Sequence, residues 1–140
     1  MIEEIINNIN YRLNEKTLTA EVAEKSGGYE GAIVIPETVV FNDVTYRVTT
    51  IGEWAFCGCQ SLTSIIIPAS VTSIGSSAFD GHSSALIIYG IAGSYAEIYA
   101  NENGITFKLI GDMPIVAEVD ALKALVTAYP ANALLVLNND

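Results

Sequence analysis

The central part of the sequence repeats itself with an offset of 23 residues. The run VTTIG at 48–52 recurs as VTSIG at 71–75. The match continues over an Ala-Phe pair, a glycine and a serine, so that Ala55, Phe56, Gly58 and Ser61 fall on Ala78, Phe79, Gly81 and Ser84. A unit this short cannot bury its own apolar residues, so successive units must stack and share one core. The repeat therefore predicts a solenoid, in which equivalent residues form ladders about 4.8 Å apart.

A third, partial copy of the unit precedes these two. AIVIPETV at 32–39 matches SIIIPASV at 64–71, with Pro36 in the place of Pro68. We expect a short strand in each coil that ends at the proline, which has no N–H for a ladder. The next VTTIG is delayed by the insert VFNDVTYR. Its Asn42-Asp43 pair lies between two β-rich runs and predicts a hairpin with a two-residue turn.

The second half of each unit is expected to turn the chain back. We expect Gly52 and Gly75 at this corner, in the positive-φ conformation that glycine adopts without steric cost. The Ala-Phe pairs at 55–56 and 78–79 are then expected to form a short helical turn, with the small and the large side chain filling the coil interior.

Segments at both ends of the array are expected to act as caps, because an open solenoid must cover its core and its strand edges. On the N-terminal side, a hairpin is predicted around Asn14-Glu15-Lys16. On the C-terminal side, Ser94 and Glu97 form a capping box at the start of a helix. Asn103-Gly104 is expected to end this helix, and ITFKLI at 105–110 follows as a strand.

The repeat resembles the BspA-like leucine-rich repeat, which is common in bacterial cell-surface and secreted proteins. IPASVTSIGSSAFDG at 67–81 fits the pattern I-P-x-x-V-T-x-I-G-x-x-A-F-x-G-C of that family, and the resemblance covers about residues 9–110. Two departures are a very short array and His82, which stands where the pattern has Cys. The predicted fold is a β-rich solenoid: a short right-handed leucine-rich-repeat-like array of parallel strands with an N-terminal hairpin cap and a C-terminal helix-plus-strand cap.

The domain organisation follows from the extent of the repeats. We expect residues 1–111 to form one solenoid with its caps. It divides into three repeats and a terminal cap, at about 32–47, 48–70, 71–93 and 94–111. Residues 112–140 carry no repeat match, but apolar residues recur there at helical spacing and predict an amphipathic helix. This segment either docks back on the array or begins a further module, and the abrupt ending after LLVL favours the second.

The charge balance is strongly acidic, with 16 Asp and Glu against 6 Lys and Arg and a net charge of −10. Such a surface repels phosphate backbones and anionic lipids, so we expect neither nucleic-acid binding nor membrane insertion. No apolar run approaches the ~20 residues of a membrane-spanning helix. The start, MIEEIINNIN, lacks the basic and apolar regions of a signal peptide. The chain is therefore expected to be cytoplasmic or a mature or trimmed form of an exported protein, and the resemblance implies the cell surface or the exterior.

Cys57, Cys59 and His82 are the only cysteines and the only histidine of the chain. Structural zinc takes four ligands, and the fourth would have to be an acid such as Asp80. A Cys59–His82 pair could form a nucleophilic site, but no third group is there to orient it. The repeat accounts for the pair better, because both residues hold the same position in successive coils. We therefore expect free thiols, no metal, no cofactor, no catalytic residue and no enzyme activity.

An apolar stripe is expected on the outer face of the strands. Ile65 and Ile67 should point into the core, which leaves Ile66 on the outside. Val34 and Tyr89 hold the equivalent place in the neighbouring coils, with Ile87 as the alternative to Tyr89. This stripe is either a contact surface or a face that the C-terminal helix or a neighbouring molecule covers.

Trp54 stands at a position that the repeat leaves variable, since the next coil has Ser77 there. It is either an exposed anchor of the kind enriched in binding hot spots or a plug over the hairpin insert. Trp54 and the stripe of Val34, Ile66 and Tyr89 together predict a non-catalytic interaction module with a protein or glycan partner. Self-association through the solenoid face or ends is a further possibility. The alternative is a purely architectural spacer or end domain of a longer chain, with no ligand of its own.

Overall fold

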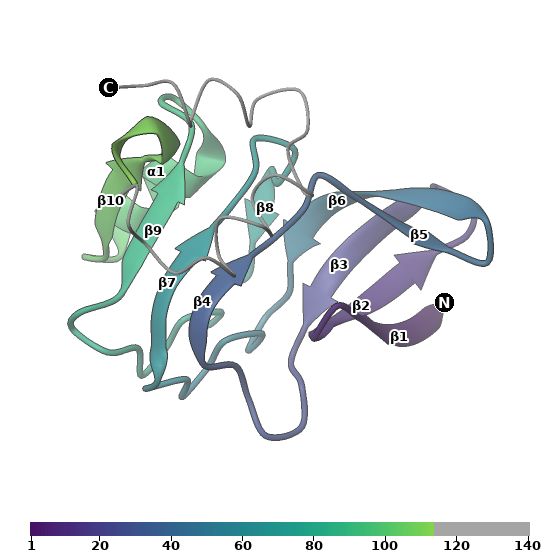
Figure 1. The fold of residues 1–140 in the computed structure, drawn as a ribbon, viewed down its shortest axis with the longest axis horizontal. Helices are drawn as coiled ribbons and strands as arrows, with labels where there is room; N and C mark the ends of the chain where they lie inside the picture. The colour runs from purple at the N-terminus through teal and green to yellow at the C-terminus, as the bar shows by residue number, and fades with distance from the viewer. Residues whose placement is uncertain (114–140) are drawn as a thin grey trace.

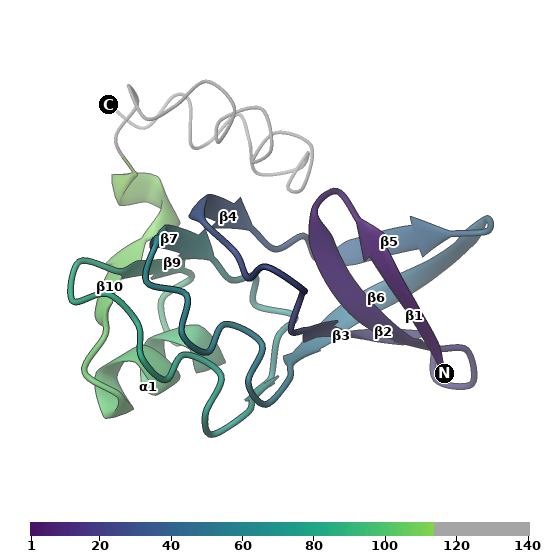
Figure 2. The ribbon, with the colours of Figure 1, turned by 90° about the horizontal axis from the view of Figure 1, so that it is seen from below.

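The computed structural model describes residues 1–113. The helix predicted within 112–140 therefore lies outside the described residues. Two sheets form the framework of the described part (Figure 1). In the turned view of Figure 2, the N-terminal strands lie at one end of the molecule, and the helix α1 (Tyr95–Glu102) and the strand β10 (Thr106–Leu109) lie at the other. None of the described helices is long and apolar enough to cross a membrane.

A four-stranded sheet is built from the repeat strands and has the order β10-β9-β7-β4. Its strands are β4 (Gly31–Val34), β7 (Leu62–Ile66), β9 (Ile87–Gly90) and β10 (Thr106–Leu109). All three pairings in this sheet are parallel. The register joins Ile33, Ile65 and Ile88 in one buried row, as stacked coils require.

A six-stranded sheet has the order β1-β2-β3-β6-β5, with β8 also paired to β6. Its strands are β1 (Ile2–Ile6), β2 (Ile9–Asn14), β3 (Thr19–Ala23), β5 (Thr38–Phe41), β6 (Val44–Ile51) and β8 (Ser73–Ile74). β3, β6 and β8 pair in parallel, whereas β1–β2, β2–β3 and β5–β6 are antiparallel. This sheet is therefore mixed rather than wholly parallel, because three hairpins join its strands.

Two of these hairpins have two-residue turns in which both residues are left-handed. Asn42 and Asp43 have φ values of 50° and 65°, and this hairpin was predicted. Asn7 and Asn8, with φ values of 49° and 71°, form a turn that the sequence reasoning missed. Such turns match the twist of antiparallel strands, and asparagine and aspartate tolerate them well. The hairpin after Asn14 was also predicted, and the Asn14 side chain accepts hydrogen bonds from two backbone N–H groups of its turn.

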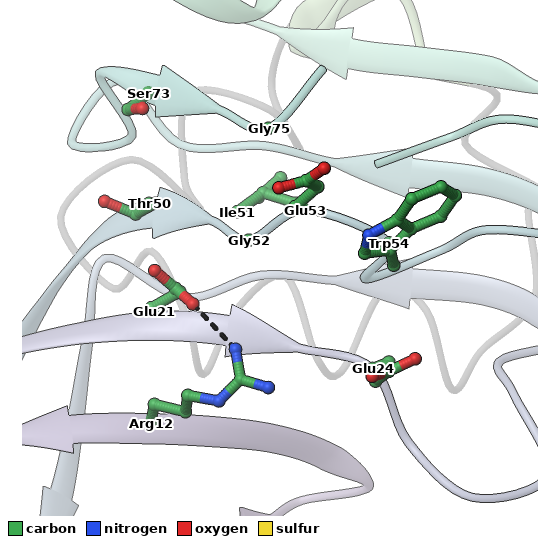
Figure 3. Close-up of a pocket in the computed structure, with 10 residues that line it drawn as sticks. All are labelled: Arg12, Glu21, Glu24, Thr50, Ile51, Gly52, Glu53, Trp54, Ser73 and Gly75. Atoms are coloured by element: carbon green, nitrogen blue, oxygen red, sulfur yellow. Dashed lines mark hydrogen bonds and ion pairs between the residues drawn. The ribbon is translucent and has the colours of Figure 1, made fainter. Parts of the chain in front are cut away.

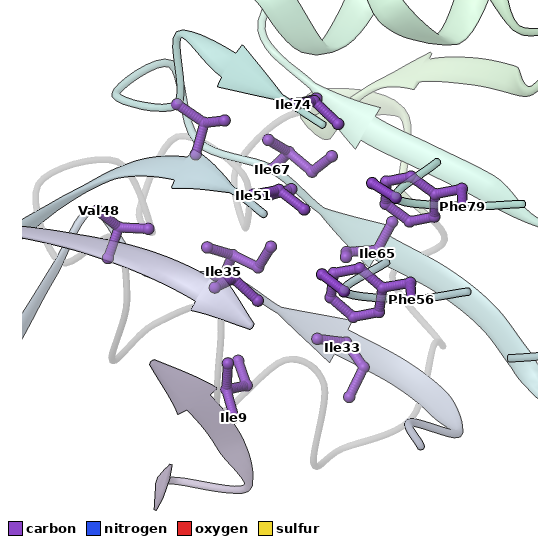
Figure 4. Close-up of a cluster of buried hydrophobic side chains, with 14 of the residues drawn as sticks. Ile9, Ile33, Ile35, Val48, Ile51, Phe56, Ile65, Ile67, Ile74 and Phe79 are labelled. Carbon is purple, nitrogen blue, oxygen red and sulfur yellow. The ribbon is translucent and has the colours of Figure 1, made fainter. Parts of the chain in front are cut away.

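The core lies between the two sheets and holds an aromatic stack (Figure 4). The rings of Phe56 and Phe79 are stacked with centroids 5.0 Å apart, so the repeated Phe forms the expected ladder. Tyr29 continues the stack on one side, 4.7 Å from Phe56, and Tyr99 on the other, 5.8 Å from Phe79. The stack thus extends beyond the recognisable repeat in both directions.

The turns that carry these rings are hydrogen bonded from coil to coil. The N–H of Phe56 donates to the Ala78 carbonyl, and the N–H of Gly58 donates to the Asp80 carbonyl, both at 2.7 Å. Gly58 and Gly81 adopt positive φ values of 72° and 74°. The positive φ predicted for Gly52 and Gly75 is wrong, because those two glycines serve a close approach of backbones instead.

The helix α1 (Tyr95–Glu102) follows the last repeat strand, and a short 3-10 helix covers Ile110–Asp112. The predicted capping box between Ser94 and Glu97 does not form. Glu97 accepts a hydrogen bond from the N–H of Gly93 at 2.8 Å, whereas the Ser94 hydroxyl is buried without a hydrogen-bond partner in the described part. Gly104 is left-handed just after the helix, as predicted.

Candidate functional site

A row of polar side chains crosses the outer face of the six-stranded sheet. Strand pleating places neighbours on opposite faces, so Tyr11 and Leu13 are buried while Arg12 points outward. The pairing register then puts one outward residue of each strand beside the next. The row runs from β1 to β8 through Glu3, Arg12, Glu21, Thr50 and Ser73. The buried row beside it contains Tyr11, Val22, Ile51 and Ile74.

A groove of about 480 Å³ lies along this row (Figure 3). It extends over the carboxyl ends of β3, β6 and β8, which meet at one edge because these strands are parallel. The chain that leaves those ends supplies the rest of the lining. The lining consists of Arg12, Glu21, Glu24, Thr50, Ile51, Gly52, Glu53, Trp54, Ser73 and Gly75.

The charged residues of the groove fall into two groups. Arg12 is paired, since its guanidinium donates to Glu21 at 2.9 Å and its Nε lies 3.6 Å from Glu3. The carboxylates of Glu24 and Glu53 are exposed, and they form no ion pair or hydrogen bond with any described residue. In Figure 3, Trp54 and Glu24 lie away from the Arg12–Glu21 pair, toward the other end of the groove.

Trp54 has an unusual backbone conformation for a bulky residue. Its φ is +68°, whereas Ser77 at the same place in the next coil is not left-handed. This conformation costs about 1–2 kcal/mol for a residue with a Cβ. The indole lines the groove, and 48% of the residue's surface is exposed. The backbone thus holds the indole at the groove despite this cost.

Gly52 and Gly75 form the floor of the groove because neighbouring coils touch there through their backbones. The N–H of Gly52 donates to the Val22 carbonyl, and that of Gly75 to the Ile51 carbonyl, both at 2.8 Å. A Cβ on Gly75 would lie 2.5 Å from the backbone N and Cα of Glu53. These glycines therefore set how closely β3, β6 and β8 approach one another at the site.

Val34, Ile66 and Tyr89 are brought together at a different place, on the four-stranded sheet. They are in register across β4, β7 and β9. Ile66 and Tyr89 are 2% and 5% exposed, and with Ile110 they form a second apolar cluster that Val34, Ile87 and Met113 flank. The register thus selects Tyr89 over Ile87 as the partner of Ile66. A binding role for this stripe remains a prediction.

Cys57, Cys59 and His82 do not converge on a common point. The Cys59 thiol is buried and accepts a hydrogen bond from the Tyr29 N–H at 3.4 Å, whereas Cys57 is exposed, and both thiols are free. His82 Nδ1 lies 2.8 Å from the carbonyl oxygen of the next residue, Ser83. No group of three or more His, Cys, Asp and Glu suited to a metal ion occurs among residues 1–113.

The repeat matches the profile of a known family, described as "BspA type Leucine rich repeat region (6 copies)", over residues 37–102. Residues 37–102 are a BspA-type leucine-rich repeat region. The resemblance drawn from the sequence is thereby confirmed. No curated protein matches the chain.

Two solved structures of bacterial leucine-rich repeat proteins are similar to the chain. A leucine rich cell surface protein from Faecalibacterium prausnitzii A2-165 is 29% identical with a TM-score of 0.54, covering 67% of this chain and 24% of that one. A leucine-rich repeat protein from Bacteroides ovatus is 34% identical with a TM-score of 0.53, covering 63% of this chain and 23% of that one. The fold is therefore a leucine-rich-type repeat solenoid, and the chain spans about a quarter of the length of each relative.

Sequence reasoning singled out the variable pair Glu53-Trp54 but missed Arg12, Glu21 and Glu24. Arg12 and Glu21 face each other across the predicted β2–β3 hairpin, so alternation along that hairpin was a usable signal for this pair. No comparable signal placed them next to Glu53 and Trp54. That neighbourhood depends on the parallel pairing of β3 with β6, which joins a non-repeating segment to a repeating one.

Proposed function

We propose that this chain is a non-catalytic interaction module of a bacterial surface or exported protein, and that the groove beside Trp54 is its contact site. The observation that carries the proposal is the half-exposed indole of Trp54, which lines the groove from a left-handed backbone position. Tryptophan is enriched among residues that dominate binding energy, because a large rigid side chain gains much contact at little entropic cost. The partner is a protein or a glycan.

A structurally similar protein supports the assignment to a bacterial surface protein. One of the structurally similar proteins is described as a cell surface protein. The proposal also includes the finer architecture: a right-handed array in which the β1–β3 hairpins cap one end, and α1 with β10 caps the other. Caps of this kind close both ends of the array and leave the sides of the coils for contacts.

The test compares the binding of the full chain and of two variants to an array of peptides and an array of oligosaccharides. Trp54→Ala removes the indole from the groove. Ile98→Ala is the matched control, because Ile98 is an equally exposed large apolar residue, at 48%, on α1 outside the groove. We expect probes that bind the wild type and Ile98→Ala but not Trp54→Ala. A chain that binds nothing on either array, or equal binding by all three proteins, would contradict the proposal and favour an architectural spacer.

A further inference from the structure

We infer that the groove binds a basic side chain, a lysine or arginine in an exposed segment of a protein partner. This inference rests on the proposed function, since it names the ligand class of the same groove. Three observations carry it: the unbalanced charge of the lining, the position of the indole relative to that charge, and the acidic field of the whole chain.

The lining carries more negative charge than its single cation balances. Arg12 is occupied by Glu21, with Glu3 on its other side, so this part of the groove contains a closed ion-pair cluster. Glu24 and Glu53 remain without a cationic partner among the described residues. A cation that enters the groove gains the attraction of two carboxylates, whereas an anionic ligand meets repulsion and a neutral one gains nothing from them.

The indole of Trp54 lies near the two carboxylates of the groove that lack a cationic partner among the described residues. Trp54 directly follows Glu53 in the chain, and in Figure 3 it occupies the same end of the groove as Glu24. The face of an indole attracts a cation more strongly than any other aromatic side chain does. Carboxylates and an indole together therefore recognise an ammonium or guanidinium group on an apolar stem, which matches lysine and arginine.

The volume of the groove and the net charge of the chain agree with a lysine or arginine side chain as the ligand. The groove volume of about 480 Å³ falls within the range of about 300–1,000 Å³ that is common for ligand pockets. The net charge of −10 attracts basic partners over a distance and speeds their encounter with the chain. A neutral glycan would also stack on the indole, but it would leave the two carboxylates uncompensated. The charge pattern thus favours the basic peptide.

The chain contains a single tryptophan, so its fluorescence reports on the groove directly. The probes are the peptide Ac-Gly-Lys-Gly-Arg-Gly-amide, the same peptide with both basic residues replaced by glutamine, and the neutral sugar maltotriose. We expect a saturable fluorescence change with the basic peptide alone. Raising the salt concentration should weaken this binding, because the charges are exposed.

Variants then assign the binding to the groove. Glu24→Gln and Glu53→Gln should each weaken binding of the basic peptide about 2- to 5-fold, as expected for exposed charge pairs. Glu102→Gln is the matched control: it removes one negative charge from an exposed residue of α1, outside the groove, and should have a smaller effect. Trp54→Ala, followed by calorimetry because it lacks the fluorophore, should weaken binding about 2- to 30-fold.

The outcomes separate this inference from the proposed function. Equal affinity for the basic and the glutamine peptide, or an equal loss in all three Glu→Gln variants, would overturn the inference. Saturable binding of maltotriose without binding of the basic peptide would overturn it too, while the groove remained a contact site. If array probes that depend on Trp54 are found and the basic peptide still does not bind, the inference fails and the proposed function stands.

Discussion

Gly75→Ala is the sharpest test of how the coils are spaced at the groove. A Cβ at this position would lie 2.5 Å from the N and Cα of Glu53 and 2.9 Å from the carbonyl carbon of Gly52. All three are backbone atoms, so no rotamer change relieves the clash. The coils must move apart there, which also stretches the hydrogen bond from the Gly75 N–H to the Ile51 carbonyl, now 2.8 Å long.

The expected magnitude follows from opposing effects. Overpacking of this kind costs about 1–3 kcal/mol, and weakening the hydrogen bond adds up to about 1 kcal/mol. Alanine also restricts the unfolded chain, which offsets about 0.4–1 kcal/mol. The free energy of unfolding should therefore fall by about 2 kcal/mol, which lowers the melting temperature by roughly 8–16 °C for a domain near 100 residues.

Urea and thermal unfolding followed by circular dichroism measure this loss. Ser76→Ala is the control, since it changes the exposed neighbouring residue and should stay within about 0.5 kcal/mol of the wild type. Gly52→Ala should cost less than Gly75→Ala, because its closest contact, at 2.7 Å, is the movable Glu21 carboxylate. A Gly75→Ala protein as stable as Ser76→Ala, or an inverted order of the two glycine variants, would refute the reasoning.

Three further predictions concern the core and the response to pH. Phe79→Ala should lower the free energy of unfolding by about 3–5 kcal/mol in urea titrations, because it removes the middle of the aromatic stack. Ile66→Glu should destabilise the fold strongly by burying an unpaired charge, whereas Ile98→Glu on α1 should hardly change the melting temperature. Burial raises the pKa values of Tyr11, Tyr29 and Tyr99 above 10.0. The folded chain then keeps protons that the unfolded chain loses, so stability should be fully present below about pH 10 and decline above it. Tyr29→Phe should reduce the decline, and an unchanged midpoint between pH 9 and pH 12 would contradict this assignment.

The sequence predicted those parts of the fold in which one coil repeats the next. The Ile65–Ile88 pair and the Phe56–Phe79 stack follow from the 23-residue offset, because equivalent residues of stacked coils must be neighbours. The Ile33–Ile65 pair follows from the match of 32–39 with 64–71. The hairpin at Asn42-Asp43 was equally accessible, since turn chemistry is local. For Ile66 the sequence left two alternatives, a contact surface or a covered face, and the structure packs it against Ile110, which lies outside the repeat.

Non-local pairing between unlike segments could not be predicted from the sequence. β3 lies next to β6, and no internal similarity connects TAEVA with VTYRVTTI. The glycines illustrate a related limit. An invariant glycine in a repeat indicates either positive φ or a close approach, and the sequence does not separate the two. The structure assigns positive φ to Gly58 and Gly81 and the close approach to Gly52 and Gly75.

Among residues 1–113 the Trp54 groove draws its indole from one coil, although the coil unit occurs twice. Glu53-Trp54 and Ser76-Ser77 occupy equivalent positions, each directly after a glycine that fixes the coil spacing. Only the first coil, however, has β3 as its neighbour on the N-terminal side, and only β2 and β3 supply Arg12, Glu21 and the adjoining Glu24. The site therefore lies where the non-repeating hairpin joins the array. The repeat contributes a rigid frame there, and the two variable residues after Gly52 contribute an indole and a carboxylate that the next coil lacks.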